Sequence, residues 1–323
     1  MKKNRFLTIL LATALLFAGY NANAQGRIEL GRSAENSVKL HSSSMAGFTS
    51  TFSFNSIESE LIANEKGEFS EIYIDGSFPY GEVGSPELPM ITRLIVIPDG
   101  ATPMVKVSGY SESEYKLADY GIGKLAAMQA PIRKSVDPRT VEYSVNKAAY
   151  ARDSYNNDEI ATVEYLGTMR GISIGKLTVC PVRYNPVAGT VKVYNDIDVK
   201  VGFQNADEAS TRNMFAATYS PAFNSVYDQM FNIDMLMGGS GKDAYTDHPD
   251  MYNTPVKMLV ICYSGFKDNS KLNEWLQWKL QKGYYVDIFY TDETGTSATN
   301  IKNFIKTKYN ASVSAGNAYT YLI

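Results

Sequence analysis

The chain has 323 residues, of which 44% are hydrophobic and 20% are charged, so it is neither a disordered nor a fibrous protein. Its formal net charge of −3 gives no electrostatic footprint for nucleic acid or for an anionic membrane surface. The length predicts about two domains, and only two cysteines are present, which excludes a scaffold held together by disulfides.

The first 24 residues have the pattern of an export signal. Three cationic residues precede an apolar run over residues 6–19, and the small residues Ala-Asn-Ala at 22–24 then offer a signal peptidase site. The apolar run is shorter than the roughly 20 residues that a membrane span requires, which favours a signal over a lone membrane anchor. We therefore predict cleavage between Ala24 and Gln25, export, and no membrane span after signal removal.

Residues from about 27 to 205 have the pattern of short antiparallel strands. Runs rich in β-branched and aromatic residues, such as EIYI at 71–74 and RLIVI at 93–97, are separated by turn residues. Asp196 and Asp198 alternate with apolar residues, as in a strand with one face in water. The pattern predicts an antiparallel all-β domain of the sandwich or barrel type.

After residue 254 strand and helix patterns alternate. We predict a buried strand at 257–262, a helix at 269–282 closed by Gly283, a strand at 284–290, a helix capped by Thr299, and a strand at 319–323. The order βαβαβ is typical of the start of a doubly wound α/β domain. Because a chain that stops in such a strand would leave backbone groups unpaired, we expect the natural protein to continue beyond Ile323.

A glycine-rich stretch, GGSGKDAYTDHP at 238–249, lies between the two regions. A Walker phosphate loop needs a glycine five positions before its Gly-Lys pair and Ser or Thr after the lysine. Leu236 and Asp243 occupy these positions, and a carboxylate there would repel phosphate. Two interpretations stay open. The stretch is either a plain domain linker or an activation linker, in which glycine lets the backbone extend into a protease cleft and Lys242 marks the cut.

The residues indicate no complete catalytic or metal site. Cys180 and Cys262 each lie in an apolar strand-like run and are expected to be unpaired buried thiols. The histidines are His41, in a Ser-rich segment, and His248, in the glycine-rich stretch. A Cys/His dyad needs its thiol within hydrogen-bond reach of an imidazole, and a metal site needs grouped ligands. We therefore expect no catalytic residue, cofactor or metal ligand on this chain.

Several motifs, in order along the chain, resemble the precursors of gingipain-type cysteine peptidases, and the lysine-specific type most of all. The resemblance extends from about residue 52 to residue 323. The motifs are FPYGEVGSPELP at 78–89, PDGATP at 98–103, LGTMRG at 166–171, YTDH at 245–248, YNTPV at 252–256, WLQWK at 275–279 and QKG at 281–283.

The resemblance implies a signal at 1–24, a β-rich propeptide at 25–242 with an activation linker at 238–242, and the start of a caspase-like catalytic domain at 243–323. It implies an endopeptidase that acts on protein and peptide substrates after basic residues, Lys rather than Arg, and that is secreted or held on the surface of a Gram-negative bacterium. The propeptide would bind its own catalytic domain, inhibit it and assist its folding. The catalytic His and Cys, and any calcium ligands, are expected downstream of Ile323, so the chain alone would be inactive.

The resemblance also suggests two sites in the propeptide. It implies a maturation cut after Lys242, made by the enzyme itself or by a partner protease, that leaves Asp243 as the first residue. The loop APIRKSVDP at 130–138 contains two prolines, which favour an extended conformation. By resemblance, Lys134 of this loop would occupy the acidic specificity pocket, with Arg133 as the alternate. From the residues alone, a solvated charged loop is the competing interpretation.

A function of another class also stays open. The same pattern fits a secreted β-sandwich binding or adhesion protein with an appended α/β module. A longer reading frame with His-Gly and Cys motifs after further strands would favour the peptidase.

Overall fold

The computed structural model describes residues 26–31, 36–237 and 256–323. The predicted signal and its cleavage site between Ala24 and Gln25 lie outside these residues. Among the helices that are described, none has the length and apolar character needed to cross a membrane.

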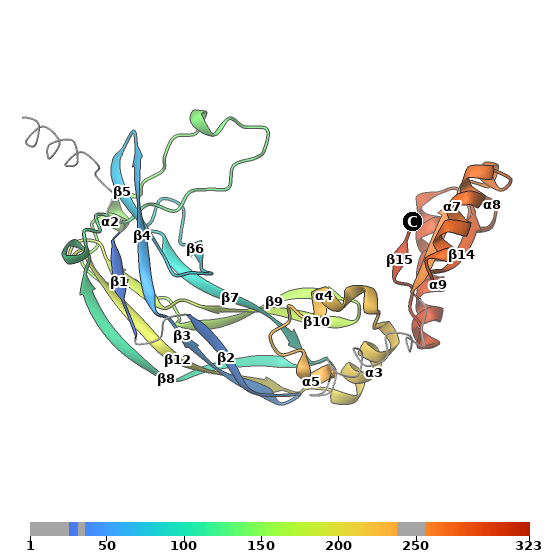
Figure 1. The fold of residues 1–323 in the computed structure, drawn as a ribbon, viewed down its shortest axis with the longest axis horizontal. Helices are drawn as coiled ribbons and strands as arrows, with labels where there is room; N and C mark the ends of the chain where they lie inside the picture. The colour runs from blue at the N-terminus through green and yellow to red at the C-terminus, as the bar shows by residue number, and fades with distance from the viewer. Residues whose placement is uncertain (1–25, 32–35, 238–255) are drawn as a thin grey trace, which may run out of the picture.

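Antiparallel sheets make up the chain from residue 27 to residue 204 (Figure 1), here called the β region. Its strands are β1 (Arg27–Glu29), β2 (Ser37–Ser44), β3 (Gly47–Ser53), β4 (Ser56–Asn64), β5 (Gly67–Tyr73), β6 (Phe78–Tyr80), β7 (Leu88–Ile97), β8 (Thr102–Lys116), β9 (Ala161–Met169), β10 (Ile172–Val179), β11 (Val182–Asn185) and β12 (Thr190–Gln204). Short helical turns interrupt them at η1 (Leu117–Tyr120), η2 (Pro138–Thr140) and α2 (Lys147–Tyr150).

The described strands of the β region pair in three sheets. One is a 3-stranded sheet of order β1-β4-β5, one is a 4-stranded sheet of order β6-β7-β10-β9, and one is a 5-stranded sheet of order β11-β12-β3-β2 in which β8 also pairs with β12. These strand pairings are antiparallel. The prediction of an antiparallel, layered β domain is confirmed.

Strand β12 organises the largest sheet. It pairs with β8 along its whole length, from Thr190 opposite Lys116 to Gln204 opposite Thr102. Since β8 occupies one edge of β12, β11 and β3 share the other edge. Its side chains alternate strictly between buried and less buried positions, and Asp196 and Asp198 are exposed as predicted. An irregularity in pairing with β8 falls at the same place, between residues 195 and 199.

The sheets share one apolar core. Phe48, Phe52, Ile95, Leu177 and Val199 are each at most 2% exposed and belong to a single cluster. Burial of side chains of this size contributes roughly 1.5–3 kcal/mol each to folding, so this cluster is the main reason the sheets hold together.

Two buried asparagines complete the core with hydrogen bonds. The Asn195 amide accepts from Phe54 N at 2.7 Å and donates to Phe54 O at 2.8 Å. The fully buried Asn232 side chain does the same for Val96, with distances of 2.7 Å to the nitrogen and 2.9 Å to the oxygen. Each side chain thereby satisfies a backbone N–H and C=O that the sheet ladder leaves open.

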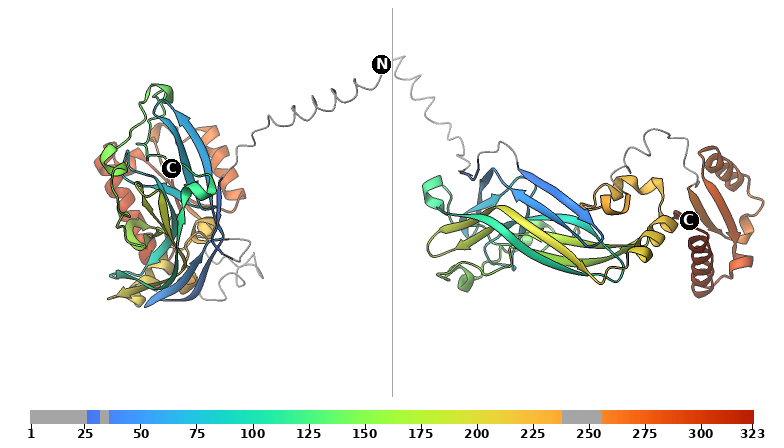
Figure 2. Two further views of the ribbon diagram at one scale, coloured as in Figure 1. Left: turned by 90° about the vertical axis from the view of Figure 1, so that its left-hand side faces the viewer. Right: turned by 90° about the horizontal axis from the view of Figure 1, so that it is seen from below.

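A helical segment that the sequence pattern did not predict follows the sheets (Figure 2, gold). It contains α3 (Glu208–Thr218), η3 (Pro221–Phe223), α4 (Asn224–Tyr227) and α5 (Asp234–Met237). Helix α3 begins because the Asp207 side chain accepts from Ser210 N at 2.8 Å, as an N-cap does.

The last part of the chain, residues 256–323, is called the α/β region. It contains β13 (Lys257–Cys262), η4 (Ser264–Phe266), α7 (Ser270–Gln281), β14 (Tyr285–Tyr290), α8 (Thr291–Thr294), α9 (Ala298–Ser314) and β15 (Tyr321–Leu322). Its sheet has the order β14-β13-β15, and both pairings are parallel. The predicted βαβαβ order is confirmed, with a first strand at the centre as in doubly wound sheets.

The helix boundaries in the α/β region partly correct the prediction. Asn269 caps α7 and Gly283 follows its end with φ of 84°, as expected. The prediction that Thr299 caps the next helix was wrong. Helix α9 starts at Ala298, two residues earlier than a Thr299 cap requires, and the Ser297 hydroxyl accepts from Asn300 N at 3.1 Å instead. Both residues suit an N-cap chemically, so the pattern could not separate them.

Candidate functional site: a clamped, exposed loop

The predicted inhibitory residues lie on a loop that stands away from the sheets. Residues 130–143, here called the 130–143 loop, leave the β region as the green excursion near the top of Figure 1. Arg133 and Lys134 are both exposed, and Val136 N donates to Arg133 O at 2.9 Å, so Lys134 lies inside a turn. The expectation of an extended loop over residues 130–138 was wrong at residues 133–136, which form this turn, and at residue 138, where a 3-10 turn begins.

The ends of this loop are clamped together. Ser144 N donates to Gln129 Oε1 at 2.9 Å, and Gln129 Nε2 donates to Ser144 O at 3.0 Å. The Tyr143 hydroxyl accepts from Ala127 N at 2.7 Å, and the Tyr143 ring lies 5.4 Å from the Phe69 ring. The base is therefore ordered by hydrogen bonds and packing, while the tip is presented to solvent.

The segment that leads into the loop is tied to two neighbouring stretches of chain. Ala126 N donates to Ser70 O at 2.8 Å, and Glu87 N donates to Ala126 O at 2.9 Å. Met128 N continues the series with a bond to Ser85 O at 2.9 Å. Residues 124–128 thus run between β5 and the start of β7, and the position of the loop depends on both.

Two carboxyl groups meet beside this segment. The Glu87 side chain shares a hydrogen bond with Glu71, and burial, followed by the charge of Glu71, raises the pKa of Glu87 to about 7. The raised pKas of Tyr143 and Tyr150 have burial as their main cause, with the Glu87 charge as a smaller one. Lys124, at the start of this segment, has its ammonium 4.2 Å from the centre of the Tyr150 ring. The sequence pattern did not predict this pair.

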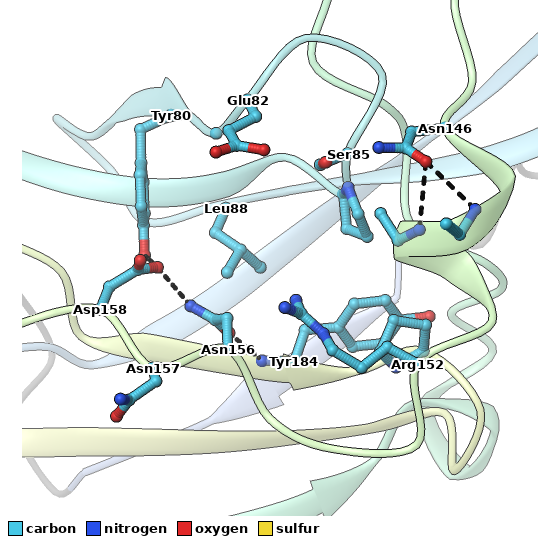
Figure 3. A pocket seen from close by; sticks show the side chains of 15 residues that line it. Tyr80, Glu82, Ser85, Leu88, Asn146, Arg152, Asn156, Asn157, Asp158 and Tyr184 are labelled. Carbon is cyan, nitrogen blue, oxygen red and sulfur yellow. Dashed lines mark hydrogen bonds between the residues drawn. The ribbon is translucent and has the colours of Figure 1, made fainter.

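A cavity of about 730 Å³ lies on the other side of residues 81–86 (Figure 3). Its walls carry Tyr80, Glu82, Arg152, Asp158 and Tyr184. The Tyr80 hydroxyl donates to Asp158 Oδ2 at 3.2 Å. The lining is polar and carries charges of both signs, but it lacks the thiol and imidazole that a cysteine peptidase uses.

The cysteines and the described histidine do not form a dyad. Cys180 and Cys262 are free, as predicted, but only Cys180 is buried and Cys262 is partly buried. Burial raises the pKa of the Cys180 thiol, which is the opposite of what a nucleophilic thiolate needs. His41 lies on the exposed face of β2 and contacts Thr51 Oγ1 at 2.7 Å. His248 lies outside the described residues.

The described residues do not test the predicted cleavage site, and they show no group of metal ligands. Lys242 and Asp243, the proposed cleavage site, lie outside the described residues. Within residues 26–31, 36–237 and 256–323, no three His, Cys, Asp or Glu side chains gather as a metal site.

Comparisons with known proteins agree with the architecture. The C25 propeptide family model matches residues 27–230, and the model of peptidase family C25 matches residues 251–323. Lys-gingipain HG66 of Porphyromonas gingivalis is 43% identical over 321 residues, which cover 98% of this chain and 18% of that protein. Gingipain R1 of the same organism is 25% identical over 325 residues, which cover 99% of this chain and 30% of that protein. The chain thus spans less than a third of the length of these relatives.

A solved structure supports the same assignment. It is described as structural insight into zymogenic latency of gingipain K from Porphyromonas gingivalis, and it is 42% identical with a TM-score of 0.54. The match covers 56% of this chain and all of that one. From its propeptide match over the β region and its peptidase match over the α/β region, the chain belongs to peptidase family C25, as a gingipain propeptide followed by the start of the catalytic domain.

Proposed function

We propose that this chain is the N-terminal part of an exported cysteine endopeptidase zymogen that cleaves after basic residues, lysine in preference to arginine. The catalytic thiolate and the histidine that acts as its base belong to the longer protein, beyond Ile323. The observation that carries the proposal is the clamped loop on which Lys134 is exposed, in a chain 43% identical to Lys-gingipain HG66. The rival interpretation as an adhesion protein does not account for the peptidase match over residues 251–323.

The propeptide inhibits by presenting Lys134 as a substrate-like side chain. A pocket that selects lysine carries negative charge, and an exposed ammonium can enter it without distortion of the propeptide because the loop base is already ordered. A charge-assisted hydrogen bond of this kind contributes about 1.5–3 kcal/mol. Arg133, its exposed neighbour, is the alternate residue for the same pocket.

Lys134→Ala tests this role. We expect the inhibition constant of the propeptide against the mature enzyme to rise about 10- to 100-fold, since every 1.4 kcal/mol is tenfold. Arg133→Ala is the matched control and should change the constant much less. An unchanged constant for Lys134→Ala would remove the proposed role, and a larger effect of Arg133→Ala would transfer it to Arg133.

Maturation cuts the chain between Lys242 and Asp243. The glycines before the bond allow an extended backbone, and the lysine matches the proposed specificity. N-terminal sequencing of the mature enzyme should begin at Asp243, and a distant start would contradict the proposal. A full-length variant without its catalytic cysteine separates the two routes, because cleavage of that variant requires a partner protease.

Export to the cell surface or beyond completes the proposal. The signal at residues 1–24 directs secretion, and the propeptide then starts at Gln25. The propeptide binds its own catalytic domain and helps it fold, and calcium binding belongs to the part of the catalytic domain that follows Ile323. Mass spectrometry of the exported precursor should find Gln25 at its N-terminus.

A further inference from the structure

The end of helix α3 contacts the α/β region through residues 217–223, here called the docking segment. Ala318 N donates to Ala217 O at 3.2 Å, and the Thr320 hydroxyl donates to Ser220 Oγ at 3.0 Å. The rings of Phe223 and Tyr321 lie 6.4 Å apart with an angle of 35° between their planes. Helices α3 and α9 are neighbours, as Figures 1 and 2 show.

These contacts satisfy polar groups that the β region leaves open. The last four carbonyls of a helix have no partner within it, and Ala217 O belongs to this set in α3. Its partner is the Ala318 amide of the α/β region. Ser220 is 2% exposed and Ala318 is 5% exposed, so water does not replace either contact. A buried hydroxyl without a hydrogen-bond partner destabilises the fold, so Ser220 needs the Thr320 hydroxyl as its partner.

The β region holds the docking segment from its other side. Arg170, in the turn between β9 and β10, donates from Nε to Thr218 O at 3.0 Å, and its guanidinium lies 4.8 Å from the centre of the Phe223 ring. The Thr218 hydroxyl donates back to Arg170 O. Arg170 has φ of 47°, a left-handed conformation that few non-glycine residues adopt, so the turn is held in place at some conformational cost.

Gly171, which follows Arg170, allows the β9–β10 turn to approach helix α3 closely. A Cβ added at Gly171 would lie 2.5 Å from the Met214 side chain of α3, and its φ of 74° is also left-handed. The turn and the helix are therefore packed as one unit. The Phe223 ring contacts both the Arg170 guanidinium and the Tyr321 ring, so a single side chain links the sheets to β15.

We propose that the docking segment is a second attachment surface between the propeptide and its catalytic domain, separate from the 130–143 loop, and that its partner is the connection from α9 to β15. This inference rests on the proposed zymogen function, because it needs a propeptide that binds its catalytic domain. Two attachment surfaces make the second contact intramolecular once the first has formed, so cleavage of the junction alone does not release the propeptide.

A cross-link between the two surfaces tests the proposal directly. The Ser220 and Thr320 hydroxyl oxygens are 3.0 Å apart, so the sulfurs of Ser220→Cys and Thr320→Cys come within reach of a disulfide. After mild oxidation of the full chain, peptide mapping by mass spectrometry should find positions 220 and 320 linked. The matched control is Ser225→Cys with Thr320→Cys, since Ser225 is exposed and lies outside the docking segment. Absence of the 220–320 link, or equal yields from both pairs, would overturn the proposal.

A second measurement does not depend on cysteine. Phe223→Ala should raise the hydrogen-exchange rate of the Ala318 amide roughly 3- to 10-fold, since one aromatic contact is lost. The amides of β13 should not change. Lys134→Ala should leave both the cross-link and the exchange rate as they are, so failure of the docking proposal is distinct from failure of the inhibitory role. Unchanged exchange at Ala318 in Phe223→Ala would count against the docking segment.

Discussion

Replacement of Glu87 by glutamine removes one charge beside the segment that leads into the 130–143 loop. In the folded chain, burial and the neighbouring Glu71 raise the pKa of Glu87 from 4.5 to about 7. At 1.36 kcal/mol per pKa unit, a fully buried group with this shift would destabilise the fold by about 3 kcal/mol when ionised. Glu87 is partly exposed, and solvent screening reduces the expected effect to about 1.5 kcal/mol.

The sign follows from the protons that each state binds. Below about pH 4.5 Glu87 is protonated in the folded and unfolded chain, and its charge costs nothing. Between about 4.5 and 7 the folded chain holds the proton that the unfolded chain releases, so stability falls as the pH rises. Above about 7 Glu87 is charged in the folded and the unfolded chain, and the full cost is present. Glutamine keeps the shape and can donate to Glu71 at every pH.

Hydrogen exchange of the full chain measures this effect locally. At pH 8 we expect the amides of Ala126 and Met128 to be about tenfold better protected in Glu87→Gln than in the unaltered chain, because 1.4 kcal/mol is tenfold. At pH 4.5 these amides should be equally protected in the two chains. Glu68→Gln, an exposed change on β5, the strand that carries Glu71, is the control and should have no effect at either pH. Equal protection at pH 8, or a benefit that grows toward low pH, would refute the reasoning.

Two further changes address the β region. Asn232→Ala leaves the Val96 N–H and C=O without their buried partner, so we expect a loss of about 2–4 kcal/mol in the free energy of unfolding, seen as a lower urea midpoint with an unchanged slope. Gly47→Ala would place a Cβ 2.2 Å from Val201 O at φ of 141°, so it should destabilise by more than 2 kcal/mol in thermal unfolding. Gly67→Ala is its control, because φ there is 120° but no atom lies within 4 Å, and only the smaller conformational cost of about 1–2 kcal/mol is expected.

Local sequence patterns predicted most of the strands and helices, but not which strands lie next to one another. Alternation around Asp196 and Asp198 identified a strand with one wet face, and the apolar run at 257–262 identified a central parallel strand. Strand order depends on contacts between residues far apart in sequence, such as Thr190 with Lys116, for which a single sequence has no signal. The helical segment after residue 207 was missed, although Asp207 followed by Glu208 is a helix-start pattern.

The candidate site, like the fold, was only partly predictable from the sequence. Prolines and charges in residues 130–138 were enough to predict an exposed loop with Lys134 on it. The sequence could not predict the contact between Glu71 and Glu87, because residues 124–128 connect β5 with the chain just before β7. The contact between Ser220 and Thr320 joins positions 100 residues apart and depends on two regions being folded.

The long pairing of β8 with β12 has a consequence for the order of folding. Contacts between residues so distant in sequence close large loops and give slow folding. Because β12 ends at Gln204, the largest sheet cannot close until almost all of the propeptide has left the ribosome. Helix α3 emerges next and the α/β region last. Vectorial appearance of the chain therefore allows the β region to be completed before the α/β region can fold.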